Sequence, residues 1–243
     1  PATFKGSMGS SVLKIFDMTM ATTGINEKTA LQLGLNVDKV YLAPANHAGY
    51  YPGGQAMTMK VLFEKETYKL LGAQIVGYDG VDKRIDVLAT AIFAGMSALE
   101  LKDLDLSYAP PYSSAKDPVN LAGFMIENIA AGNLHQFFLP EMDHLSKDAT
   151  WIDARTPGEY SRGHIDGFIN IPVDKIREHL AELDKSKPVY VHCQTGLRSY
   201  IACRILMQHG YTAYNFSGGY RLWESVHLDK LAAEKIHPCG MDK

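Results

Sequence analysis

The stretch Val189-Tyr-Val-His-Cys-Gln-Thr-Gly-Leu-Arg198 decides the fold of the second half of this chain. Its first four residues are β-branched, aromatic or His, and they predict a short buried strand. Residues 199–208 carry apolar side chains at helical spacing and stop before Gly210, which predicts a helix. The six residues between them, 193–198, form the predicted loop. A strand, a short loop and a helix therefore surround Cys193.

Cys193 is the predicted nucleophile of this loop. It follows a strand and precedes a helix, so backbone N–H groups and the helix dipole can offer positive potential to its sulfur. Arg198 adds a permanent positive charge. Such surroundings favour the thiolate, which is the reactive form of cysteine. The N–H groups that can curl round the sulfur belong to the loop residues Gln194, Thr195, Gly196 and Leu197.

The other two cysteines have different interpretations. Free cysteines are more often small buried hydrophobic residues, and Cys203, on the inner side of the predicted helix, is expected to be one. Cys239 lies in the C-terminal tail, with no evident partner. Three widely spaced cysteines predict neither a disulfide framework nor a zinc site, so no metal site is expected.

The pattern Cys193-x-x-Gly196-x-Arg198 between strand and helix resembles the active loop of the rhodanese sulfurtransferases. The resemblance implies transfer of sulfane sulfur: Cys193 attacks a donor such as thiosulfate or a polysulfide, carries the sulfur as a persulfide and passes it to a thiol acceptor. It also implies that Arg198 orients the donor or the leaving group. A cysteine phosphatase or arsenate reductase is one alternative, although phosphatases place the arginine where this chain has Ser199. A non-catalytic rhodanese-like module is the other.

Further residues of the second half match rhodanese domains as well: Asp153-Ala-Arg155, Glu159, Gly163-His-Ile165 and Gly218-Gly219. Strands alternating with helices predict a doubly wound parallel α/β domain over 137–230. Asp153, Arg155 and Glu159 are expected to support the site by pairing charges. His192 is not expected to act as a base, because neighbouring strand residues point to opposite faces.

The first half predicts a different architecture. Residues 57–64 and 69–77 form a predicted β-hairpin, and residues 12–23 are expected to make one more strand. Helices are predicted after Asn26, from Asp82 towards Gly95 and over residues 118–131. The expected domain, residues 1–132, is an α+β unit with an antiparallel sheet. Together with the parallel α/β domain predicted for the second half, it makes the predicted class of the whole chain α/β.

The segment Tyr108-Ala-Pro-Pro-Tyr112-Ser, together with the predicted hairpin, resembles the interface domain of the pyridine nucleotide–disulfide oxidoreductases. The most similar branch is the coenzyme A disulfide and persulfide reductases, including forms fused to a rhodanese domain. The resemblance implies that residues 1–132 form a homodimer. It also implies that Tyr50 and Tyr108 reach across the dimer to a coenzyme A disulfide pocket; the alternative is that both are ordinary interface aromatics.

The same resemblance defines the expected cofactors. No Gly-x-Gly-x-x-Gly follows a predicted strand, and no redox cysteine precedes Cys193. We therefore expect no cofactor in this chain, while FAD, NAD(P)H and coenzyme A would belong to a longer parent of which the chain is a C-terminal fragment.

Composition narrows the possible partners. The 243 residues are 46% hydrophobic, with a formal net charge of −3, which gives no reason to expect a nucleic acid partner. No apolar run is long enough to span a membrane and no signal peptide is recognisable, so a cytoplasmic protein is expected.

Overall fold

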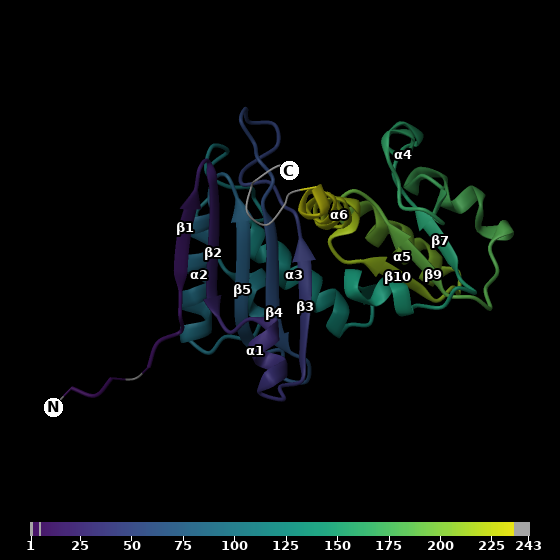
Figure 1. The fold of residues 1–243 in the computed structure, drawn as a ribbon. Helices are drawn as coiled ribbons and strands as arrows, with labels where there is room; N and C mark the ends of the chain where they lie inside the picture. Colours follow the sequence, from purple (N-terminus) through teal and green to yellow (C-terminus); the bar gives the residue numbers. More distant parts are fainter. Residues whose placement is uncertain (1, 5, 236–243) are drawn as a thin grey trace. The chain divides into compact units, whose positions relative to one another are not determined.

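The computed structural model describes residues 2–4 and 6–235, with side chains as far as Leu228. Contacts within the chain divide it into two compact units, one ending at Ala131 and one beginning at Gly132. The first contains an antiparallel sheet and the second a parallel sheet, both with helices (Figure 1). The predicted α/β class, with an α+β unit followed by a parallel α/β unit, is confirmed.

The first unit is built on a five-stranded sheet in the order β1-β2-β5-β4-β3, with every neighbouring pair antiparallel. The predicted hairpin is its centre, because β4 pairs with β5 over most of their length. The strands are β1 (Ser11–Ile15), β2 (Met18–Gly24), β3 (Val37–Leu42), β4 (Thr58–Glu64) and β5 (Leu70–Gly77).

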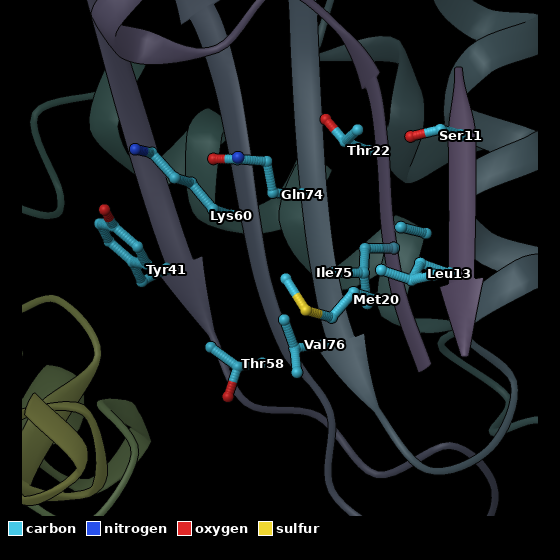
Figure 2. A pocket seen from close by; sticks show the side chains of 11 residues that line it. Ser11, Leu13, Met20, Thr22, Tyr41, Thr58, Lys60, Gln74, Ile75 and Val76 are labelled. Carbon is cyan, nitrogen blue, oxygen red and sulfur yellow. The ribbon is translucent and has the colours of Figure 1, made fainter. Parts of the chain in front are cut away.

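Two long helices, α2 (Val81–Phe93) and α3 (Pro118–Ala130), supply the core of the first unit. They pack against one face of the sheet through alternate strand residues such as Met59, Val61 and Ile75, which are fully buried. Burying each such side chain contributes about 1.5–3 kcal/mol. The opposite face of the sheet bears a hollow lined by residues of its strands (Figure 2). Two smaller helices complete the unit: α1 (Glu27–Gln32), capped by Asn26 as predicted, and the 3₁₀ helix η1 (Glu100–Asp103).

The prediction of a single strand over residues 12–23 was wrong. The segment is a hairpin, with Ile15 opposite Met18 and a two-residue turn at Phe16 and Asp17. Phe16 adopts a left-handed conformation with φ of 51°, which glycine or asparagine usually supplies in such turns. Since neither residue stands there, the sequence carries no turn signal, and the alternation of side chains runs on through the turn.

The second unit contains a five-stranded parallel sheet in the order β6-β10-β9-β7-β8. Its strands are β6 (Gln136–Phe137), β7 (Thr150–Asp153), β8 (Ile169–Asn170), β9 (Val189–His192) and β10 (Ala213–Phe216). Its helices are α4 (Pro157–Arg162), α5 (Leu197–Gln208), α6 (Gly219–Lys235) and the 3₁₀ helices η2 (Leu139–His144), η3 (Val173–Glu178) and η4 (Leu180–Glu182).

Alternate side chains of β9 pack into two different hydrophobic cores, one on each face of the sheet. Val189 and Val191 belong to an aliphatic cluster with α5, whereas Tyr190 belongs to an aromatic cluster with Phe137, Phe216 and Tyr220. The sheet is therefore buried on both faces, as expected for parallel strands. This alternation also separates His192 from Cys193.

Three details of the second unit differ from the sequence predictions. The edge strand β6 was missed, because two residues are too short to show a pattern. The sequence of residues 176–183 predicts a helix, but the structure has two 3₁₀ turns there, η3 and η4, each closed by short-range hydrogen bonds such as His179 N–H to the Ile176 carbonyl. Helix α5 begins at Leu197, so Arg198 stands in its first turn and not in the loop. None of the helices in the described residues is long and apolar enough to cross a bilayer.

Candidate active site

Cys193 follows β9 directly, and its side chain is buried. The Gly196 N–H donates a hydrogen bond to its Sγ over 3.2 Å, and the Ser199 hydroxyl lies 3.3 Å from the same sulfur. Gly196 precedes α5 with φ of 110°, a conformation that side chains rarely adopt. The sulfur therefore sits at the N-terminal end of a twelve-residue helix, where positive potential favours a thiolate.

The Ser199 hydroxyl has two acceptors within reach. It lies 3.1 Å from the Gly196 carbonyl as well as 3.3 Å from Cys193 Sγ. A hydroxyl has a single proton to donate. Ser199 can thus bond to the backbone while the sulfur is a thiol and turn to the sulfur when it becomes a thiolate.

The reactive loop is held from behind by the start of α6. The Tyr220 N–H donates to the Cys193 carbonyl at 2.8 Å, and the Arg221 N–H donates to the Gln194 carbonyl at 3.0 Å. This close approach requires Gly219, because a Cβ atom there would lie 2.7 Å from the Cys193 carbonyl oxygen. The pair Gly218-Gly219 therefore fixes the backbone that carries the nucleophile.

Arg198 forms a two-point ion pair with Glu159 of α4. Its Nη1 and Nη2 atoms lie 2.7 and 2.6 Å from the two carboxylate oxygens of Glu159. The hydrogen bonds that Arg198 donates hold the pKa of Glu159 well below its usual range, and the same bonds raise the pKa of Arg198. Arg198 also interacts with the Cys193 side chain. The arginine thus joins the cysteine to a carboxylate that lies 39 positions before Arg198 in the sequence.

Asp153 and Arg155 form a second ion pair, which is completely buried. Arg155 Nη2 lies 2.7 Å from an Asp153 carboxylate oxygen and donates to the Gly163 carbonyl at 2.8 Å. Its guanidinium carbon also lies 3.9 Å from the centre of the Tyr220 ring. The pair joins the end of β7, the end of α4 and the start of α6, all of which border the reactive loop.

His192 faces away from the reactive sulfur, into the aromatic cluster. Its ring centre lies 4.5 Å from that of Phe168, and its Nε2 lies 3.4 Å from Asp153 Oδ2. Burial lowers the pKa of His192 to about 4, so the imidazole is neutral at neutral pH. These contacts support its exclusion as a base.

A small polar cavity of about 290 Å³ lies beside the loop. Its lining contains two arginines and two glutamates, and the Gln194 side chain faces the guanidinium of Arg155 at 3.4 Å. It is lined by Arg155, Glu159, Arg162, Gly163, Gln194, Tyr220 and Glu224.

Cys203 is fully buried in the aliphatic core, and burial raises the pKa of its thiol strongly. This environment disfavours the reactive thiolate, as expected for a core residue. Cys239 lies outside the described residues. Within those residues, no cluster of three or more His, Cys, Asp or Glu side chains is arranged to hold a metal ion.

In the first unit the structure brings Tyr50 and Tyr108 together. Their hydroxyl oxygens lie 2.6 Å apart, and both side chains are exposed. The hydrogen bond with Tyr50 raises the pKa of Tyr108. The two tyrosines come from loops 58 positions apart, so their meeting is a property of the fold.

Arg84 is the buried side chain that ties these two loops together. Its Nη2 donates to the Asn46 carbonyl at 2.7 Å on the side of Tyr50, and to the Tyr112 carbonyl at 3.3 Å on the side of Tyr108. It also pairs with Asp117 at 2.9 Å, directly before α3. One arginine therefore positions both tyrosine-bearing loops.

A hollow of about 430 Å³ lies on the sheet of the first unit (Figure 2). Apolar side chains such as Leu13, Met20 and Val76 line it, and the polar side chains of Gln74 and Lys60 line it as well. The Lys60 ammonium is 2.6 Å from Glu27, so its charge is already paired. Among the described residues, its lining contains no cysteine, histidine, aspartate or glutamate and is mostly apolar, which gives the hollow the character of a contact surface.

Comparison with known proteins agrees with this division of the chain. Residues 10–118 match the model of the pyridine nucleotide–disulphide oxidoreductase dimerisation domain, and residues 140–226 match that of the rhodanese-like domain. The first unit is therefore a dimerisation domain of that oxidoreductase family, and the second is a rhodanese-like domain.

Individual relatives are more specific. The structure of reduced CoADR-RHD from Bacillus anthracis has a TM-score of 0.90 and 46% identity, covering 93% of this chain and 41% of that one. A NAD-dependent persulfide reductase from A. fulgidus has a TM-score of 0.83 and 38% identity, over 92% of this chain and 40% of that one. The coenzyme A disulfide reductase of Staphylococcus epidermidis is 41% identical over 121 residues, 50% of this chain and 27% of that protein.

The predicted resemblance to coenzyme A disulfide and persulfide reductases with a rhodanese domain is confirmed by these relatives. The chain spans only about a quarter to two-fifths of their lengths. Its own residues do not fit FAD or a nicotinamide dinucleotide: the first sheet is antiparallel, and the βα turns of the second lack the Gly-x-Gly-x-x-Gly spacing.

Sequence reasoning missed the contact of Ser199 with the sulfur and treated this residue only as a departure from phosphatases. The signal was available, because Ser199 is two residues into α5 and faces back over the preceding turn. The pairing of Arg198 with Glu159 carried no such signal, since it depends on how α4 packs beside the loop.

Proposed function

We propose that the second unit is a sulfurtransferase in which Cys193 carries sulfane sulfur to a thiol acceptor. The observation that supports it best is the sulfur itself: Cys193 Sγ lies beside the Gly196 N–H and the Ser199 hydroxyl, at the N-terminal end of α5. These donors stabilise a thiolate, and the same donors can stabilise a persulfide anion after transfer. The match to a rhodanese-like domain supports the same chemistry.

The proposed reaction has two displacement steps. The Cys193 thiolate attacks the outer sulfur of a donor R–S–SH; the new S–S bond forms as the old one breaks, and R–S⁻ leaves with the electron pair. A thiolate acceptor then attacks the outer sulfur of the Cys193 persulfide and restores the Cys193 thiolate. No net oxidation or reduction occurs over the two steps, and neither needs a base, in agreement with the position of His192.

The remaining site residues have proposed supporting roles. The N–H groups of residues 194–197 bind the transferred sulfur, and Arg198 lies between the sulfur and Glu159. Asp153 and Arg155 brace the loop through their buried pair. The proposed limits of this unit are 137–230.

For the first unit we propose a homodimer formed by residues 1–132. Its match to a dimerisation domain supports this, and so do exposed aromatic side chains such as Tyr50, Tyr51 and Tyr112. We also propose that Tyr50 and Tyr108 contact a coenzyme A disulfide across the dimer, and that FAD and NAD(P)H are bound by further domains of the whole oxidoreductase. Sedimentation of residues 1–132 and 137–230 tests the assembly, with a dimer expected for the first and a monomer for the second.

The sulfurtransferase is tested by intact mass after incubation with thiosulfate or a thiol persulfide. We expect one added sulfur, on the peptide that contains Cys193. Thiocyanate release from donor and cyanide measures turnover, and phosphate release from an aryl phosphate tests the phosphatase alternative. Absence of both activities, with no added sulfur, would favour a non-catalytic module.

A further inference from the structure

We propose that Glu159 selects the sulfur donor by charge: because it occupies Arg198, the site takes sulfur from thiol persulfides that carry at most one negative charge, in preference to dianions such as thiosulfate. The inference rests on the proposed sulfurtransferase function and names its donor class. It assigns a role in donor specificity to Glu159, which the sequence analysis expected only to support the site by pairing charges.

The first step is that the guanidinium of Arg198 is already occupied. Two parallel contacts of 2.6 and 2.7 Å to one carboxylate are the strong, fork-to-fork arrangement of this ion pair. Both side chains are largely covered, with 31% and 23% of their surfaces exposed. A dianionic donor that needed this arginine would have to displace a carboxylate that fits it well.

The second step is that Glu159 is held in place from its own helix. Its Oε2 accepts from the Thr156 N–H at 3.0 Å and from the Thr156 hydroxyl at 2.7 Å, in a capping box that begins α4. This anchoring opposes a swing of the carboxylate away from Arg198. Because Arg198 also holds the pKa of Glu159 well below its usual range, the carboxylate stays ionised at every working pH.

The third step concerns the other charges near the loop. The adjoining cavity has two arginines and two glutamates in its wall, so its formal charge is zero. One of the arginines, Arg155, is already paired with Asp153 behind the wall. With Arg198 paired as well, a dianion approaching the loop meets no surplus of positive charge from these residues.

The fourth step is the charge of the reacting groups. Attack of the Cys193 thiolate on thiosulfate brings three negative charges together, and the products are the persulfide anion of Cys193 and sulfite, which again carry three. Attack on R–S–SH involves one negative charge, which leaves on R–S⁻, and attack on R–S–S⁻ involves two. Like charges in a partly buried site repel strongly, so each additional charge slows the approach. A site with a neutralised arginine therefore favours the persulfide.

The test compares kcat/KM for thiosulfate and for the persulfide of a small uncharged thiol, both with cyanide as acceptor. We expect Glu159→Gln to raise kcat/KM for thiosulfate about tenfold and to change the persulfide value less than about threefold. Glu159→Asp keeps the charge and should keep the preference for the persulfide. Glu178→Gln is the matched control, since it removes one carboxylate of the same unit from an exposed pair with Lys175.

A salt titration of the wild-type protein gives a second measurement that needs no variant. Salt screens charges, so repulsion of thiosulfate predicts that kcat/KM for this donor rises with ionic strength while the persulfide value changes less. An unchanged donor ratio in Glu159→Gln, or a thiosulfate rate that falls with salt in the wild type, would overturn the selection by charge. Failure of Cys193 to take sulfur from either donor would instead overturn the sulfurtransferase function itself.

Discussion

The two units use an arginine in opposite ways. Arg84 in the first unit is 1% exposed and binds three backbone carbonyls and Asp117. All of these partners belong to the protein, so the charge of Arg84 is compensated inside it. Arg198 in the second is 31% exposed and binds one carboxylate at the edge of the reactive loop. A buried arginine with many partners sets the shape of loops, whereas a partly exposed one that pairs with a carboxylate beside the reactive cysteine can set the charge that a substrate meets.

This comparison extends to the units themselves. The first unit presents exposed tyrosines and a mostly apolar hollow with no cysteine, histidine or carboxylate among the described residues of its lining, which is the character of a surface for contacts. The second presents a buried sulfur with hydrogen-bond donors and a small cavity of balanced charge. Substitutions in the first unit should therefore act on stability and assembly, and substitutions in the second should act on chemistry.

The largest effect is expected at Cys193. Cys193→Ser removes the atom that carries the sulfur, so we expect thiocyanate release to fall by at least about 10³-fold. Cys203→Ser is the control: its thiol lies in the core, and most of the activity should remain. Mass spectrometry of the loaded protein checks the site, and added sulfur on Cys203 or Cys239 would refute the assignment.

The next effect concerns Arg84 and should appear only in the first unit. Burial alone would raise the pKa of Asp117, but hydrogen bonds from Arg84 and Ser113 hold it below its usual value. Arg84→Met leaves this carboxylate buried without its cation, so we expect a loss of about 3–5 kcal/mol of unfolding free energy.

Thermal unfolding of residues 1–132 measures that loss. The double variant Arg84→Met/Asp117→Asn should recover part of it, because no unpaired charge is left. Sulfur transfer by the full chain should stay within about twofold of the wild type. A large fall in transfer activity, with the first unit still folded, would contradict the division of roles between the two arginines.

How far the sequence predicts these two regions depends on how local their contacts are. The strand before Cys193 and the donors to its sulfur, Gly196 and Ser199, lie within a few residues of it, so the pattern from Val189 to Arg198 predicted the strand, the loop and the helix. Tyr50 and Tyr108 were singled out only by resemblance, and nothing local indicated that their hydroxyls meet at 2.6 Å. The pairing of Arg198 with Glu159 is equally non-local, and it changes what the arginine can do.

The errors in secondary structure have two origins. The turn at Phe16 and Asp17 lacks the glycine or asparagine that marks such turns, and Phe16 adopts φ of 51° only because β1 and β2 pair on either side. Strand β6 exists because its two residues pair with β10, far along the chain. The hairpin was missed because its turn lacks these residues, whereas β6 was missed because it depends on pairing with a distant strand.

A smaller effect is expected from Arg198. Lysine keeps the charge but loses the planar fork that matches Glu159, so Arg198→Lys should reduce kcat/KM for sulfur transfer about three- to tenfold. Arg198→Ala should lose more, about ten- to a hundredfold, because it leaves the carboxylate of Glu159 uncompensated beside the thiolate.

The double variant Arg198→Ala/Glu159→Gln separates these two causes. Removing the leftover carboxylate should restore part of the rate if its charge is the problem, and the coupling between the two positions then follows from the mutant cycle. Full activity in both Arg198→Lys and Arg198→Ala would show that the arginine only supports the structure.

The smallest effect is expected at Ser199, whose hydroxyl can turn from the Gly196 carbonyl to the sulfur. Ser199→Ala removes one of two donors to the thiolate and leaves the Gly196 N–H in place. A hydrogen bond to a charged group contributes about 1.5–3 kcal/mol, and partial compensation by the remaining donor should limit the loss to about five- to tenfold in the thiolate population. The rate of Cys193 alkylation by iodoacetamide across pH reports this population, in a background with Cys203→Ser and Cys239→Ser. Ser161→Ala, on an exposed turn of α4, is the matched control and should leave the profile unchanged. An unshifted profile in Ser199→Ala would mean that the hydroxyl stays on the backbone, and that the Gly196 N–H and the start of α5 hold the thiolate without it.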